Sequence, residues 1–60
     1  MSKKDEKIVL MERVKNLQTS IATLQMMAIG AKENQLDNIY ERIDMFQSEL
    51  LEVQKKLLEL

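Results

Sequence analysis

The chain carries two apolar heptad seams that fall out of register at its only glycine, Gly30. Within each seam the spacing alternates between three and four residues, which is typical of helices packed along a shared line. Continuing the first seam past residue 28 would place Gln35, Asn38 and Arg42 in the interior. The chain must therefore change direction near Gly30. The first seam consists of Leu10, Val14, Leu17, Ile21, Leu24 and Ala28, and the second of Leu36, Ile39, Ile43, Phe46, Leu50, Val53, Leu57 and Leu60.

We predict an all-α fold, an antiparallel two-helix hairpin with heptad-type packing. Proline is absent and strong helix formers dominate the composition. One domain covers residues 1–60, with a helix at about 3–29, a turn at about 30–33 and a helix at about 34–60. The competing arrangement is one continuous helix in a long coiled coil, bent at Gly30, because a single glycine costs a helix only about 1 kcal/mol.

The expected helix ends have residue types that cap helices. Ser2 is the predicted N-cap of the first helix, with Asp5 three residues later in the capping-box position. Gly30 is predicted to take a left-handed conformation at the end of that helix, because it has no Cβ to clash. Asn34 is predicted to cap the second helix. The expected apolar layers of the hairpin are Leu24 with Ile39, Ile21 with Ile43, Leu17 with Phe46, and Val14 with Leu50.

Two helices cover each other on one side only, so this chain needs further support. A domain of this size buries only about 60% of its unfolded surface, and the sequence has no cysteine or histidine for disulfides or structural zinc. No charged residue occurs between Asn16 and Ala31. We therefore predict that the seams support self-association, as a homodimer or higher homo-oligomer, with two hairpins forming a four-helix bundle. Apolar residues outside the seams also indicate interfaces: Ile8, Val9, Met11, Ala22, Met26, Met27, Ile29, Tyr40, Met45, Leu51 and Leu58.

Four of these residues lie near the predicted turn and form a candidate patch for a different protein: Met26, Met27, Ile29 and Tyr40. Methionine side chains are flexible and adapt to varied partner surfaces. The alternative is that they are covered by a second copy of the chain. Both arrangements are compatible at different heights along the rod.

The residue types that carry most enzyme chemistry are missing. Without histidine and cysteine there is no obvious acid–base group near neutral pH and no thiol nucleophile. One glycine is too few for a phosphate-binding loop. We predict no enzyme activity and no cofactor. The acidic run Glu33, Asp37, Glu41 and Asp44 lacks the loop geometry of dedicated cation sites, so we expect a solvated face and no bound metal.

Five lysines are expected to meet at the open end of the hairpin and are candidate phosphate contacts: Lys3, Lys4, Lys7, Lys55 and Lys56. Acidic residues interleave with them and no aromatic side chain is available to stack on bases, so nucleic acid is the less favoured partner. In helix count and period the chain resembles the Rop family of plasmid RNA-binding proteins, which are dimers of helical hairpins. That resemblance implies an alternative function as a nucleic-acid-binding regulator, with no RNA-contacting residue carried over.

The expected function is a small non-enzymatic module that self-associates and binds another, unidentified protein as an adaptor, inhibitor or assembly factor. Only four consecutive apolar residues, Ile8 to Met11, follow the charged N-terminal segment, which is too few for a secretory signal. No stretch approaches the ~20 apolar residues of a membrane span. We therefore expect a cytoplasmic protein without membrane contact.

Overall fold

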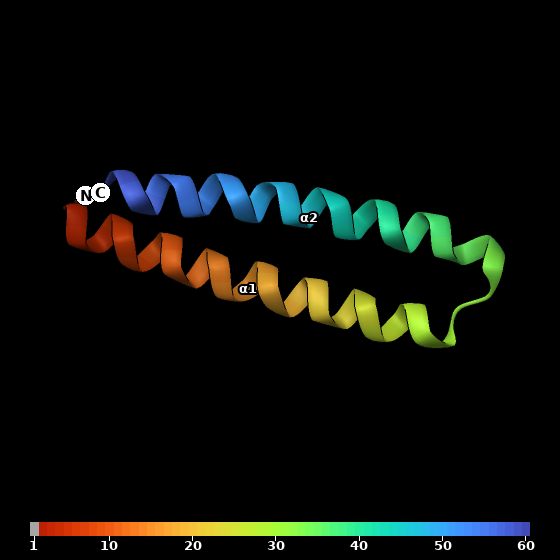
Figure 1. The fold of residues 1–60 in the computed structure, drawn as a ribbon. Coiled ribbons are helices and arrows are strands. Elements are labelled where there is room, and N and C mark those ends of the chain that lie inside the picture. Colours follow the sequence, from red (N-terminus) through yellow and green to blue (C-terminus); the bar gives the residue numbers. More distant parts are fainter. Residues whose placement is uncertain (1) are drawn as a thin grey trace.

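The computed structural model describes residues 2–60 as two helices lying side by side. Helix α1 comprises Lys3–Gly30 and helix α2 comprises Glu33–Glu59. The chain reverses between them, so that the two termini lie next to each other at one end of the rod (Figure 1). The Cα atoms span 46 × 14 × 14 Å. The predicted helical hairpin is confirmed, and the alternative of one continuous bent helix is wrong.

Helix α1 begins at the predicted serine cap. The backbone N–H of Asp5 donates to Oγ of Ser2 at 3.2 Å, and the Ser2 hydroxyl donates to Oδ2 of Asp5 at 3.0 Å. The N–H of Glu6 donates to the Ser2 carbonyl at 2.9 Å. Asp5 and Glu6 also place negative charge in the first turn, where the helix dipole favours it.

The turn differs from the prediction in two respects. Gly30 is the last residue of α1 and is not left-handed, since no residue between 2 and 60 has a positive φ. Instead Ala31 (φ −80°, ψ 150°) and Lys32 (φ −76°, ψ 155°) are both extended, and these two residues reverse the chain. Asn34 is not the cap of α2. Lys32 occupies that position, and the Gln35 side chain accepts a hydrogen bond from its N–H at 3.3 Å.

The core is a single line of apolar side chains between the helices. Its central cluster contains Ile21, Leu24, Ile39 and Ile43, and further along the rod Leu17 and Val53 are also buried. All six are seam residues, and Leu17 is the least accessible at 2%. Partly buried seam residues extend the line on both sides: Leu10, Val14, Ala28, Leu36, Phe46, Leu50 and Leu57. Leu60 is exposed at the end of the chain.

The uncharged half of α1 satisfies its hydroxyl groups locally. The Thr19 hydroxyl donates to the carbonyl of Lys15 at 3.0 Å, and the Thr23 hydroxyl donates to the carbonyl of Thr19 at 2.9 Å. These bonds to the preceding turn are the usual way in which a threonine is accommodated within a helix. They leave short side chains on this part of α1, so another helix can approach it closely.

Candidate interaction surfaces

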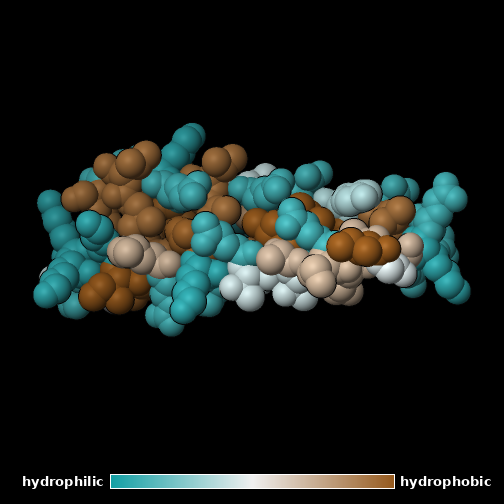
Figure 2. All heavy atoms as spheres, turned by 60° about the horizontal axis from the view of Figure 1, so that its bottom comes forward, coloured by the Kyte–Doolittle hydropathy of each residue, from teal (hydrophilic) through white to brown (hydrophobic). Residues whose placement is uncertain are grey.

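Large apolar side chains remain exposed along the whole rod. In Figure 2 brown side chains reach the surface among charged ones, most densely toward the open end. Small soluble proteins rarely leave so much apolar surface uncovered unless it serves an interface. The exposed large apolar residues are Ile8, Val9, Met11, Met26, Met27, Ile29, Tyr40, Met45, Leu51, Leu58 and Leu60.

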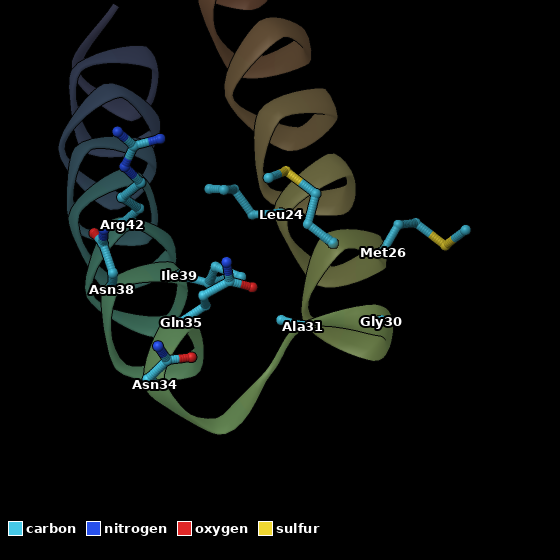
Figure 3. Close-up of a pocket in the computed structure, with 10 residues that line it drawn as sticks. Leu24, Met26, Gly30, Ala31, Asn34, Gln35, Asn38, Ile39 and Arg42 are labelled. Carbon is cyan, nitrogen blue, oxygen red and sulfur yellow. The ribbon is translucent and has the colours of Figure 1, made fainter.

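A groove lies between the helices beside the turn, where they diverge in Figure 1. Its apolar part comes from Leu24 and Ile39, with Met27 at its α1 side. Polar groups line the α2 side, where Figure 3 shows successive side chains along the helix. The groove therefore combines apolar surface with hydrogen-bonding groups and one positive charge. The polar side chains are those of Asn34, Gln35, Asn38 and Arg42.

The predicted tip patch does not form one continuous surface. Met26 and Met27 contribute to the groove wall, whereas Ile29 and Tyr40 do not line it. Figure 3 shows the Met26 side chain pointing away from α2. Successive residues of an α-helix point about 100° apart, so residues 26, 27 and 29 face three directions. All four predicted residues are exposed, and Ile29 is the most exposed of them at 82%.

An ion pair that the sequence analysis missed joins the two helices on the groove side. The Arg13 guanidinium donates to the Glu49 carboxylate across the interface, with both side chains about half exposed. A second, smaller hollow next to it is lined by Arg42, Met45, Phe46 and Glu49. Arg13 and Glu49 are 36 positions apart, so only the hairpin register relates them. In the sequence, Arg13 directly precedes a seam residue of the first helix and Glu49 directly precedes one of the second. Their opposite charges at these positions could have indicated the ion pair.

The five lysines proposed as phosphate contacts are exposed on the two helix segments that meet at the open end: Lys3, Lys4, Lys7, Lys55 and Lys56. Figure 1 places the first turns of α1 beside the last turns of α2. Asp5, Glu6 and Glu59 lie among them and are also exposed. The open end is therefore a mixed charged surface.

The arrangement of the acidic side chains and the apolar character of the helices bear on metal binding and on membrane insertion. Between residues 2 and 60, no group of three or more carboxylate, histidine or cysteine side chains is arranged to hold a metal ion. The acidic run that begins at Glu33 is thus spread along the helix surface. Within the same range, neither helix has the length and apolar character needed to cross a membrane.

Comparison of the chain with models of protein families, with curated proteins and with solved structures finds no match. None of these comparisons supports the resemblance to the Rop family that the helix count and period suggested.

Proposed function

We propose that this chain is a small non-enzymatic protein-interaction module, which self-associates and binds a different protein as an adaptor, inhibitor or assembly factor. The observation that supports the proposal is the imbalance between core and surface. Among residues 2–60, six apolar residues are buried, while eleven large apolar side chains remain exposed. The core of a domain this small rarely supplies more than about 3–5 kcal/mol, so covering further apolar surface is favourable.

The groove beside the turn is the surface that we assign to the different protein. Its apolar floor, formed by Leu24 and Ile39, is flanked by amides and by Arg42. Among residues 2–60 Arg42 takes part in no ion pair, so its charge is available to a partner carboxylate. Apolar anchors surrounded by a few polar groups are the usual composition of protein-binding surfaces.

Affinity capture with groove variants tests this assignment. The tagged full chain is compared with the double variant Met26→Gln/Met27→Gln and with the matched control Val9→Gln. Val9 and Met27 are both 53% exposed on α1, but Val9 lies near the open end, away from the groove. We expect the wild type and the Val9 variant to retain the same protein, and the methionine variant to lose it while its circular dichroism melt is unchanged.

Two other outcomes would refute the proposed partner binding or favour the nucleic-acid alternative. If no protein is retained specifically by the wild type, a binding partner other than the chain itself is refuted. The nucleic-acid alternative would instead be supported by RNA binding that weakens steeply with salt. That binding should also be lost when Lys3, Lys4 and Lys7 are changed to Glu.

A further inference from the structure

The side of the hairpin opposite the groove carries a second line of residues on each helix. On α2 the groove-side residues Gln35, Asn38, Arg42, Met45 and Glu49 each directly precede a seam residue. The residue that directly follows each seam position lies about 100° further around the helix, on the other side. We call this side the second face. It comprises Met11, Lys15, Gln18, Ala22, Gln25 and Ile29 of α1 and Asp37, Tyr40, Asp44, Gln47, Leu51, Gln54 and Leu58 of α2. The same spacing, continued toward the N-terminal end of each helix, adds Lys4, Ile8 and Glu33 to this face.

The second face is apolar or uncharged over most of its length and is not covered by the hairpin. All sixteen of its residues are exposed. The large apolar ones include Leu51 at 63% and Leu58 at 88% exposure. Its spacing alternates between three and four residues on both helices, which is the pattern that a further layer of helices requires.

Charges on the second face are separated along the rod. Its two basic residues, Lys4 and Lys15, lie in the half nearer the open end. Its three acidic residues, Glu33, Asp37 and Asp44, lie in the half nearer the turn. The second face has no acidic residue in the half nearer the open end and no basic residue in the half nearer the turn.

We infer that a second copy of this chain covers the second face, lying head to tail, with the turn of one hairpin against the open end of the other. In this orientation the acidic half of each copy covers the basic half of its partner. The alternative two-fold arrangement, turn against turn, would place acid over acid and lysine over lysine. Charge complementarity of this kind selects orientation and suppresses the wrong arrangement.

The area of the face is adequate for a stable dimer. From Cα extents of 46 × 14 Å, one long face covers roughly 600 Å² before side chains are added. That value approaches the ~800 Å² per partner of standard protein interfaces. The groove lies on the other side of each hairpin and stays open, so self-association and partner binding use separate surfaces.

This inference rests on the self-association in the proposed function, and its test separates the two. Light scattering of the full chain first gives the mass, for which we expect two chains. Leu51→Gln on the second face is compared with Met45→Gln, which is similarly exposed at 66% but lies on the groove side. We expect the first variant to raise the dimer Kd by about tenfold or more and the second to change it less than about threefold.

Orientation is measured with one spin label per chain, at Glu59→Cys, in a protein that has no other cysteine. Head-to-tail pairing predicts about 40 Å between the labels of two copies, because the 27 residues of α2 rise 1.5 Å each. Turn-to-turn pairing predicts less than about 25 Å, since both labels would lie at the same end.

Each outcome has a separate meaning. A single-chain mass overturns self-association and this inference together. A two-chain mass with a short distance overturns the orientation alone, and a dimer weakened by the Met45 variant but not by the Leu51 variant overturns the face. Reversing Glu33 and Asp37 to Lys should weaken the dimer several-fold, and reversing Lys4 and Lys15 to Glu in the same chain should restore it. Failure of that rescue overturns the charge pairing.

Discussion

Replacing Gly30 by alanine gives a test whose sign depends on the geometry of the turn. Gly30 is the last helical residue of α1 and does not have a positive φ. A Cβ built on it meets no atom within 4 Å. Gly30→Ala therefore introduces no clash, and its main effects are to reduce the backbone freedom of the unfolded chain and to raise helix propensity.

The expected size follows from these two effects. Alanine is better than glycine by about 0.8–1.0 kcal/mol within a helix, and a terminal position keeps part of that difference. We expect Gly30→Ala to raise the free energy of unfolding by about 0.4–1 kcal/mol. For a domain of 60 residues, the melting temperature should rise by about 2–8 °C.

Thermal melts followed by circular dichroism measure the effect, at one fixed protein concentration because self-association shifts the midpoint. The paired variants Ser48→Ala and Ser48→Gly calibrate the alanine–glycine difference at an exposed position within α2. If Gly30→Ala instead lowers the melting temperature by several degrees, the glycine needs a left-handed conformation. The extended turn described above would then be refuted.

Three further changes test the packing, the cross-helix ion pair and the cap. Ile21→Ala, at an 8% exposed core position, should cost about 2–5 kcal/mol of unfolding free energy in urea titrations; Val9→Ala, at 53% exposure and outside the second face, should cost well under half as much, and equal losses would contradict the seam. A double-mutant cycle on Arg13 and Glu49 should give a coupling below about 1 kcal/mol that falls with added salt, because both side chains are about half exposed. Ser2→Ala should cost about 0.5–2 kcal/mol in the same titration, and no loss would show that the cap bonds are not formed in solution.

The fold was predictable because the two seams specify which side of each helix is buried and that the two helices pack against each other. Apolar residues at alternating spacings of three and four predict which side of each helix is buried, and the phase break at Gly30 predicts the reversal. Every residue that the structure buries, such as Leu17 and Val53, is a predicted seam residue. The serine cap was predictable for the same reason, since Ser2 and Asp5 interact within one turn.

The turn was not predictable in detail, because several local solutions compete over a few residues. A glycine at a helix end favours a left-handed residue, but two extended residues reverse the chain equally well. Here Ala31 and Lys32 provide the reversal, and Gly30 remains helical. Gln35 and Asn34 are both plausible partners for the first backbone groups of α2, and the position of the reversal selected Gln35.

The candidate surfaces could not be predicted from the sequence, because they depend on the register of the hairpin. Met26, Met27 and Ile29 are close together in the sequence of α1, yet helix geometry turns them in different directions. The groove and the Arg13–Glu49 pair depend on which residues of two distant segments lie at the same height. The seams do not specify that height to within one residue.

The most direct test of the hairpin is the distance between the two chain ends within one molecule. Spin labels at Lys3→Cys and Glu59→Cys, diluted into an excess of unlabelled, cysteine-free chain, report that intramolecular distance alone. Helices packed about 8–10 Å apart predict a label separation below about 25 Å. A separation near 80 Å, the length of one uninterrupted helix at 1.5 Å per residue, would contradict the hairpin and every surface described on it.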